Sequence, residues 1–431
     1  MTEPLTVEER KQIIKLIQRE VVPAIGCTEP VAVALCVARA TELLGHRPEH
    51  IEVLLSGNIL KNAMGVGIPG TGMIGLPIAI ALGALIGKSE YELEVLKDCN
   101  PEAVEKGKRF IAEKRINIGL KEGICDKLYV EVCCKTDDHD AVAIIAGGHT
   151  HFVYWEKDGE VLLDRREPCQ DEAEEEDVSL SFKKVYDFAM TSQLDEVRFI
   201  LDSAKLNKRA AEFSFKGDYG HGLGRMLQGP IEERLMGNSI FSRILAYTSG
   251  ACDARMGGAM IPVMSNSGSG NQGISCTNPV LIYAEETGKS EEQLIRALTL
   301  SHLTVIYIKQ SLGRLSALCG CVVASTGSSC GITYLMGGTY EQITFAVKNM
   351  IANLTGMICD GAKPSCALKV TTGVSTAVLS AVMAMENRCV TSLEGIIDED
   401  IDTSIRNLTE IGAQGMNETD KLVLQIMTSK R

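Results

Sequence analysis

Cysteines are the residues in this chain whose number and distribution most suggest chemistry. The 431-residue sequence holds 15 of them, and six fall in one region: Cys276, Cys319, Cys321, Cys330, Cys359 and Cys366. Thiolates are soft ligands, so a group of them in one region suits zinc or an iron–sulfur cluster. No Cys-x-x-Cys pair occurs, which disfavours a zinc ribbon and a ferredoxin-type cluster. Thiols scattered through a core are the alternative interpretation.

Cys27 precedes a predicted helix and could act as a base or a nucleophile. Unpaired N–H groups at a helix N-terminus favour an anion, which predicts a thiol pKa lowered from about 8.5 toward neutrality. A small buried hydrophobe at a tight helix entry is the alternative. Cys276 stands in a similar sequence, Cys-Thr-Asn-Pro against Cys-Thr-Glu-Pro, so helix position alone does not choose between the two cysteines.

Two segments rich in Gly, Ser and Asn could bind an anion. They are residues 56–62, which include Lys61, and residues 266–273. Backbone N–H groups and short side-chain donors in such loops can hold a carboxylate or a phosphate, although ordinary surface turns use the same residues. Residues 65–70 have the glycine spacing of a dinucleotide loop, but Pro69 argues against a Rossmann site. No Walker or histidine-metal motif occurs in the sequence.

The helices that would carry the N-terminal motifs can be predicted from their capping signals. Thr6 and Glu9 form a capping-box pattern that opens a first helix. Thr28 or Glu29 can cap a second helix directly after Cys27, with Pro30 in its first position. Cys27 is therefore expected at a helix entry.

Apolar spacing predicts an α+β fold. Strands are expected at 51–55 and between 127 and 163, where alternating residues indicate a small antiparallel sheet. A largely α-helical domain is expected in the C-terminal half. The predicted units are an N-terminal α+β domain over 1–165 that carries Cys27 and the Gly-rich loops, an acidic linker over 166–180, and an α-rich cluster-binding domain over 181–431.

Charge and composition exclude several classes of partner. The net charge of −13 repels a phosphate backbone, so no nucleic-acid partner is expected. Many cysteines without a signal-peptide pattern predict a reducing, cytoplasmic location. Residues 62–87 carry no charge, but glycine and proline interrupt them and leave an apolar run shorter than the roughly 20 residues of a membrane span. No membrane segment is expected, and small polar substrates are favoured.

Five motifs spread along nearly the whole chain occur together in one known family. They are Ile25-Gly26-Cys27-Thr28-Glu29-Pro30, Ser56-Gly57-Asn58-Ile59-Leu60-Lys61-Asn62, Ile68-Pro69-Gly70-Thr71, Ser267-Gly268-Ser269-Gly270-Asn271-Gln272-Gly273 and Ile358-Cys359-Asp360-Gly361-Ala362-Lys363. In this combination the chain resembles the iron–sulfur L-cysteine desulfidase family. That family is related to the α chain of the bacterial iron–sulfur L-serine dehydratases. The Gly-Cys-Thr-Glu-Pro element favours the desulfidase branch.

The resemblance implies a [4Fe–4S] cluster held by three cysteines, with one iron open to substrate. The family's single cysteine and distant close pair fall on Cys319, Cys359 and Cys366. Cys321, or less readily Cys330, could replace the first of these ligands. Cys27 falls on the family's catalytic cysteine.

The resemblance also implies a lyase that eliminates sulfide from L-cysteine to give pyruvate and ammonia. Cys27 would remove the α-proton, while the open iron would bind the leaving sulfur. The residues expected to bind the substrate are Thr28, Glu29, Ser56, Gly57, Asn58, Lys61, Asn62, Asn266, Ser267, Gly268, Ser269 and Asn271.

Three other functions compete with this one. An iron–sulfur L-serine dehydratase would use the same open iron on a hydroxyl group. A pyridoxal-phosphate desulfhydrase would reach the same products, but the sequence offers no convincing lysine motif or phosphate cup. An iron–sulfur redox sensor would use its cluster to bind a partner without turnover. The expected partner is a small amino-acid substrate, and the chain could form a homodimer.

Overall fold

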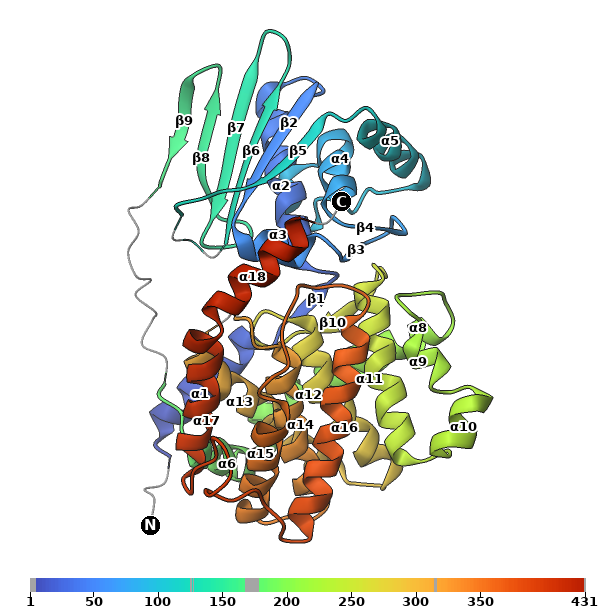
Figure 1. The fold of residues 1–431 in the computed structure, drawn as a ribbon, viewed down its shortest axis with the longest axis vertical. Helices are drawn as coiled ribbons and strands as arrows, with labels where there is room; N and C mark the ends of the chain where they lie inside the picture. Colours follow the sequence, from blue (N-terminus) through green and yellow to red (C-terminus); the bar gives the residue numbers. More distant parts are fainter. Residues whose placement is uncertain (1–4, 125, 127, 167–177, 314–315, 430–431) are drawn as a thin grey trace.

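The chain forms a sheet layer stacked on a larger helical layer (Figure 1). The computed structural model describes residues 5–124, 126, 128–166, 178–313 and 316–429. The predicted α+β class is confirmed, with the sheet in the N-terminal half and helices through the rest of the described chain. Most of the expected acidic linker, residues 167–177, lies outside the described residues.

The sheet layer holds one six-stranded sheet in the order β5-β2-β6-β7-β8-β9. Its strands are β2 (His50–Leu55), β5 (Ile116–Leu120), β6 (Tyr129–Lys135), β7 (Asp140–Ala146), β8 (Phe152–Lys157) and β9 (Glu160–Asp164). The antiparallel sheet expected between 127 and 163 is confirmed as β6 to β9, and β2 with its parallel partner β5 extends the sheet at one edge. A helical crossover separates β2 from β5, and a five-residue strand that contains Gly119 gives a weak alternation signal.

Helices cover one face of this sheet. They are α2 (Thr28–Leu44), α3 (Gly57–Ala63), α4 (Leu76–Ile86), η1 (Ser89–Glu94) and α5 (Pro101–Ala112), and the short pair β3 (Gly67–Ile68) and β4 (Met73–Ile74) lies beside them. α2 packs on β6 and β7, and α4 packs between α2 and α5. Val130, Val132 and Cys134 alternate into the shared core, as a period of two requires.

The helical layer contains the remaining elements. They are α1 (Val7–Glu20), β1 (Pro23–Ile25), α6 (Phe182–Thr191), α7 (Leu194–Val197), η2 (Arg198–Ile200), α8 (Leu201–Phe215), α9 (Leu223–Met226), α10 (Pro230–Met236), α11 (Ile240–Met256), β10 (Pro262–Met264), α12 (Gly270–Glu286), α13 (Glu291–Leu312), α14 (Gly320–Leu335), α15 (Tyr340–Leu354), α16 (Cys366–Met385), α17 (Ile401–Glu410), η3 (Ile411–Gly415) and α18 (Asn417–Thr428). α14 is central, since it contacts α12, α13, α15 and α16.

The first helix is built as predicted. Thr6 accepts from the backbone of Glu9 and the Glu9 carboxylate accepts from the Thr6 backbone, which completes the capping box. Its apolar side, including Ile13 and Ile17, packs into the core of the helical layer. β1 then pairs with β10, so the chain leaves the helical layer through a two-stranded junction just before Cys27.

Backbone segments of the two layers approach closely beside this junction. A Cβ on Gly67 would lie 2.5 Å from the backbone of Gly257 and Gly258, in the turn between α11 and β10. A Cβ on Gly361, whose φ is +87°, would lie 2.1 Å from the carbonyl oxygen of Lys61. Only glycine allows approaches this close, so the glycines fix how the layers meet.

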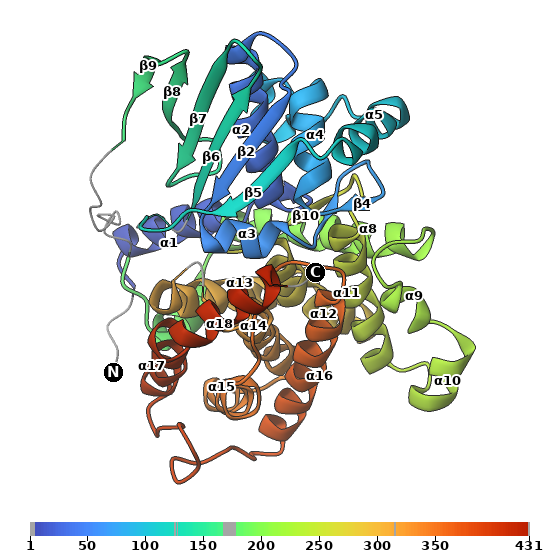
Figure 2. The same ribbon diagram turned by 45° about the horizontal axis from the view of Figure 1, so that its top comes forward.

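α18 crosses from the helical layer to α3 of the sheet layer (Figure 1, Figure 2). Its Leu424 packs against the sheet-layer core. A Cβ on Gly57 would lie 2.7 Å from a methyl carbon of Leu424. Residues 56–62, expected as a loop, form α3 instead, because Ser56 caps the segment and α18 packs on it.

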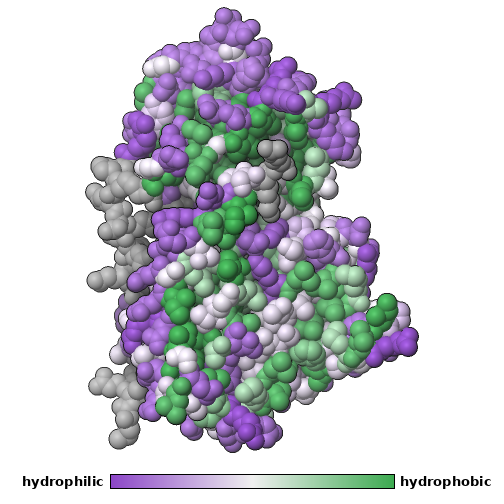
Figure 3. Space-filling view, viewed as in Figure 1, coloured by the Kyte–Doolittle hydropathy of each residue, from purple (hydrophilic) through white to green (hydrophobic). Residues whose placement is uncertain are grey.

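α16 is the one helix in the described part of the chain with the length and apolar composition of a membrane span. It packs against α11, α14 and α15. Its outer side leaves Leu379, Val382 and Met383 exposed. Figure 3 shows apolar side chains on the front of the helical layer, over the region where Figure 1 places α16. The helix is therefore buried on one side only, although its composition is apolar all round.

Candidate active site

Sulfur atoms gather in an apolar cluster of side chains where the two layers meet. Cys27, Cys252 and Cys321 are buried in one cluster of side chains, and Cys319 and Cys366 pack at its margin. Apolar neighbours complete the wall: Val66, Met256, Met357, Ala362, Ala367 and Val370. Five thiols from α2, α11, α14 and α16 therefore share one low-dielectric space.

Three backbone segments carry the cysteines expected as cluster ligands. Cys319 is the N-cap of α14, and Cys366 is the first residue of α16. Cys359 is joined to the Cys319 segment, because the Cys319 N–H donates to Met357 and the Cys359 N–H donates to Ala317. All three side chains are only partly buried. The structure thus brings the expected ligands to one place without sealing them in the core.

Electrostatic contacts tie these three sulfurs to one another. Burial and the Cys319 sulfur raise the pKa of Cys359, while Lys61 and Lys369 lower it. Burial also raises the pKa of Cys366, and both Cys319 and Cys359 add to that increase. A hydrogen bond from Cys321 lowers the pKa of Cys319 to about 7, against the effect of burial.

Lysines hold the loop between Cys359 and Cys366. Lys363 and Lys369 both pair with the Asp360 carboxylate. Burial opposes ionisation of Asp360, but the two lysines lower its pKa to about 2. Lys369 also donates to the carbonyl oxygen of Ile358, at 2.7 Å. The loop is therefore fixed in shape, and it brings positive charge beside the thiols.

The donor set fits an iron–sulfur cluster better than a single metal ion. Among the described residues no three His, Cys, Asp or Glu side chains are placed to hold one ion. Ligands of a four-iron cluster lie farther apart than ligands of one ion, because each thiolate binds a different iron. Two of the three thiols lie at helix N-termini, where an anion is stabilised.

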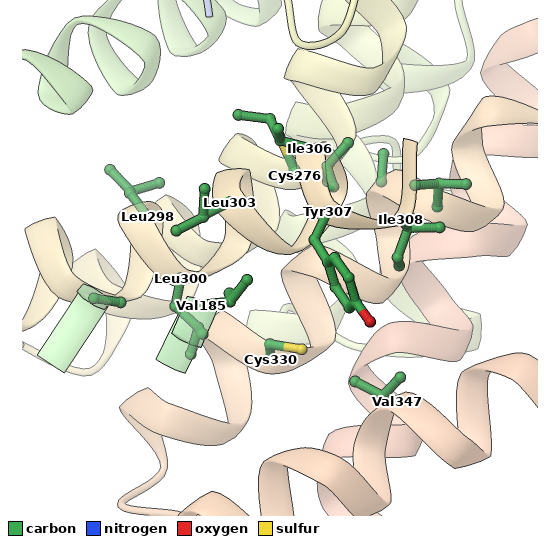
Figure 4. Close-up of a cluster of buried hydrophobic side chains, with 14 of the residues drawn as sticks. Val185, Cys276, Leu298, Leu300, Leu303, Ile306, Tyr307, Ile308, Cys330 and Val347 are labelled. Carbon is green, nitrogen blue, oxygen red and sulfur yellow. The ribbon is translucent and has the colours of Figure 1, made fainter. Parts of the chain in front are cut away.

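The alternative ligands are placed differently. Cys321 stays in the pocket, where its thiol lies 3.2 Å from the Met357 sulfur and 3.3 Å from the Lys369 carbonyl oxygen. Cys330 instead lies in the core of the helical layer, among Leu300, Val347 and their neighbours (Figure 4). Cys321 therefore lies in the same cluster as Cys319, whereas Cys330 belongs to a separate apolar cluster.

Cys27 is the N-cap residue of α2, but its thiol makes no capping hydrogen bond. It is 2% exposed, and its Sγ donates to Glu29 Oε2 at 2.8 Å. Burial and the Glu29 carboxylate raise the pKa of Cys27 well above its ordinary value, while Arg255 opposes them. The predicted fall in this pKa is therefore wrong, because burial outweighs the helix terminus. Cys276, by contrast, lies inside α12 and not at a helix entry.

Glu29 organises the side chains around Cys27. Its second carboxylate oxygen, Oε1, accepts from Asn62 Nδ2 at 3.4 Å. Thr28 Oγ1 donates to Oε2 at 3.3 Å. Thr28 and Asn62, both expected at the substrate site, therefore hold the Glu29 carboxylate, which can accept the Cys27 thiol proton.

Arg255 is a site residue that the sequence motifs miss. It stands in the last turn of α11, is 5% exposed, and donates from Nε to the Gly26 carbonyl oxygen at 3.1 Å. Its side chain also lies against Gly270 at the start of α12. No carboxylate among the described residues pairs with it. A buried cation without a counter-ion is costly, so this guanidinium is suited to an anionic ligand.

The start of α12 offers acceptors as well. Asn271 Oδ1 and Gln272 Oε1 are buried and have no hydrogen-bond partner in the described structure. Gln272 packs against Gly320, next to Cys319. Ser269 caps this helix, and Gly268 lies in open space in the loop before it. The second Gly-rich segment thus lies against Arg255 and Gly320, and it adds Gln272, which was not among the expected residues.

Asn266 and Ser267 support this loop from within. Asn266 Nδ2 donates to His302 Nδ1 at 3.0 Å, and Asn266 Oδ1 accepts from Ser267 Oγ at 2.8 Å. Because Nδ1 accepts, the Nε2–H of His302 faces Thr277 Oγ1, 3.0 Å away. Burial lowers the pKa of His302 to about 3. A neutral histidine therefore holds Asn266, whose amide is fully used.

The expected site residues on and directly before α3 also have partners inside the protein. Ser56 Oγ accepts from the backbone of Ile59 and of Tyr129, so it is a structural cap. Lys61 is 3% exposed and donates to Asp420 of α18 at 2.5 Å. Gly57 packs against α18, and Asn58 is half-buried. Lys61, the cation expected to meet substrate, already has a carboxylate partner, whereas Arg255 has none among the described residues.

Several known proteins are similar to this chain. The serine dehydratase alpha chain family matches residues 90–425. A UPF0597 protein of Bacteroides fragilis is 75% identical over 99% of this chain and 100% of its own length. A UPF0597 protein of Bacteroides thetaiotaomicron is 74% identical over 98% of both chains. One of Oleidesulfovibrio alaskensis is 45% identical over 98% of this chain and 99% of its own. The family match includes the three expected ligands but not Cys27.

The His302 network predicts a specific acid sensitivity. The unfolded chain binds a proton on this side chain near pH 6.5, whereas the folded chain does so only near pH 3. The free energy of unfolding should therefore fall as the pH drops below 6.5, by on the order of 3 kcal/mol at pH 4 from this residue. Urea unfolding of wild type and of His302→Gln between pH 7 and pH 4 measures the difference. The variant should be less stable at pH 7 and show a shallower decline, and parallel declines would contradict the assignment.

Proposed function

Because the chain belongs to the serine dehydratase alpha chain family, we propose that it is a lyase that eliminates the β-substituent of an amino acid, with L-cysteine as its substrate. One observation carries the proposal. The Cys27 thiol, hydrogen-bonded to Glu29, lies in the same cluster of side chains as Cys319 and Cys366. A proton-transfer pair thus stands beside a group of metal-ligating sulfurs.

Cys319, Cys359 and Cys366 are proposed to hold a [4Fe–4S] cluster. When bound, it supplies an iron with a free coordination position, a Lewis acid for the departing sulfur. Lys363 and Lys369 provide positive charge against the thiolates. The apolar wall keeps water from the site, which strengthens these interactions.

Arg255 is proposed to bind the substrate carboxylate. Its guanidinium is buried and lacks a counter-ion among the described residues, and carboxylate binding would supply one. The amide oxygens of Asn271 and Gln272 would accept from the substrate amino group, since both are buried without a donor. Three anchors would then fix the α-carbon near Cys27.

Cys27 and Glu29 are proposed to remove the α-proton together. The Cys27 thiol passes its proton to Glu29, with which it is already hydrogen-bonded, and the resulting thiolate takes the proton from the α-carbon. The α-carbon electron pair forms the carbon–carbon double bond while the bond from the β-carbon to sulfur breaks. The products are aminoacrylate and hydrogen sulfide ion. Aminoacrylate then tautomerises and hydrolyses to pyruvate and ammonia.

An L-serine dehydratase is the second candidate, since the matching family carries that name. The pocket wall argues for cysteine. Met256, Met357 and Cys252 line it with polarisable sulfur, which suits a thiol substituent better than a hydroxyl group. Cys27 also lies outside the part of the chain that matches the dehydratase family.

Substrate choice and the role of Cys27 can be tested together. Anaerobically reconstituted protein should release sulfide and pyruvate from L-cysteine faster than it forms pyruvate from L-serine. Cys27→Ala should lower kcat by at least about 10²-fold while the cluster absorption spectrum stays unchanged, because only the base is removed. Cys133→Ala, on the sheet, is the matched control and should keep full activity. Serine as the faster substrate would favour the dehydratase, and an active Cys27→Ala would remove Cys27 from the mechanism.

The ligand assignment predicts a difference between two cysteines of the helical layer. Cys359→Ala should lose the cluster after anaerobic reconstitution, because a cluster with two protein thiolates is poorly held. Cys330→Ala removes a core thiol and should retain normal iron and acid-labile sulfide. Iron and sulfide analysis of both variants, with circular dichroism as a check on folding, measures this. Full iron content in Cys359→Ala would show that other residues hold the metal.

Arg255 should determine substrate affinity. Arg255→Gln should raise the KM for L-cysteine by roughly 10- to 100-fold, since it removes a charge-assisted pair with the carboxylate. Arg255→Lys should recover part of the loss. Arg243→Gln, on the same helix but paired with Glu286, is the control and should leave KM unchanged. An unaltered KM in Arg255→Gln would assign the carboxylate to another group.

A further inference from the structure

A second cleft lies in the sheet layer, apart from the cysteine pocket. It has a volume of about 410 Å³ and opens between α2, η1 and the strands β8 and β9. α2 covers β6 and β7 but reaches β8 only in part, so the far end of the sheet leaves a hollow beside the helix. None of the residues that line this cleft takes part in the proposed elimination.

The floor of the cleft is an arginine stacked on aromatic rings. The Arg39 guanidinium carbon lies 4.7 Å from the Trp155 ring centre and 5.6 Å from that of Phe152. Arg39 Nε and Trp155 Nε1 are both buried, and neither has a hydrogen-bond acceptor. Two donors without an acceptor among the described residues, on a charged and aromatic surface, call for an acceptor from a bound ligand.

Charges of both signs surround these donors. Arg165 and His151 line the cleft on the strand side, and Glu90 and Glu92 line it on the η1 side. The Glu42 carboxylate already has partners inside the protein. It accepts from the backbone N–H and from Oγ of Ser89, and it forms an ion pair with Arg39, with 3.4 Å between Nη1 and Oε2. Glu90 and Glu92 have no ion pair among the described residues. The cleft therefore offers separate places for a negative group and a positive group.

We propose that this cleft binds a free α-amino acid as its zwitterion. The carboxylate would accept from Arg39 and Trp155, after the small side-chain shift that binding commonly brings. The ammonium group would face Glu90 and Glu92, and an apolar side chain would lie on Phe152. A plain anion would satisfy the donors but meet the two glutamates, so the zwitterion is preferred. The proposal stands independently of the elimination reaction.

Trp155 makes the test direct, because it is the single tryptophan of the chain. The probe is L-alanine, which lacks a β-leaving group and is not consumed. Its titration into the wild-type protein should produce a saturable change in tryptophan emission. Propionate, which lacks the ammonium group, should bind at least about tenfold more weakly, and inorganic phosphate should not compete.

Substitutions can show whether alanine binds in this cleft or elsewhere in the protein. Arg39→Gln should weaken alanine binding at least about tenfold, and Glu90→Gln with Glu92→Gln should remove the preference for alanine over propionate. Arg47→Gln is the matched control, since Arg47 also stacks on a ring, that of Phe110, in the same layer. Cys27→Ala should bind alanine normally. No saturable emission change, equal affinity in Arg39→Gln and wild type, or equal binding of propionate and alanine would each overturn the proposal.

Discussion

The site depends on how closely two backbones can approach. Cys27 belongs to the sheet layer, whereas the three expected ligands belong to the helical layer, so neither layer alone contains the pocket. Gly67 against Gly257 and Gly258, and Gly361 against Lys61, leave no room for a Cβ. The β1–β10 pair lies beside these contacts and holds the chain in register. A side chain on Gly67 or Gly361 would push the two layers apart and so separate the cysteines of the helical layer from Cys27.

The pairing of buried charges then decides which residues remain able to bind a substrate. Buried cations are stable only with a partner, and most here have one. Lys61 pairs with Asp420, and Lys363 and Lys369 share Asp360. Arg255 lacks a carboxylate among the described residues while it lies against the loop that carries Cys27. The same reasoning explains why Cys27 is protonated at rest and why Glu29 must lie beside it.

Local signals predicted the local features well. The Thr6–Glu9 capping box, the helix that begins next to Cys27 and the gathering of ligand cysteines all follow from nearby sequence or from the family resemblance. Features that depend on distant packing were missed. The parallel pairing of β5, the helical form of residues 57–63 and the raised pKa of Cys27 arise from contacts across the chain.

Arg255 and Cys252 show most clearly which site residues the sequence alone does not predict. Both stand on α11 without a motif around them, and only the tertiary fold brings them beside Cys27. A lone arginine in a helix has no sequence signal for ligand binding. The suitability of Arg255 for binding an anion can be inferred only once its burial and its lack of a counter-ion among the described residues are known. The loop residues Asn266 and Ser56, in contrast, carried a sequence signal but serve the scaffold.

The central claim is that three protein thiolates hold a cluster whose remaining iron is open to substrate. Mössbauer spectra of protein reconstituted anaerobically with ⁵⁷Fe, recorded with and without L-cysteine, test it most directly. The account predicts a [4Fe–4S] spectrum in which the signal of a single iron shifts when L-cysteine is added. A spectrum without a cluster, or one in which no iron responds to L-cysteine, would contradict it.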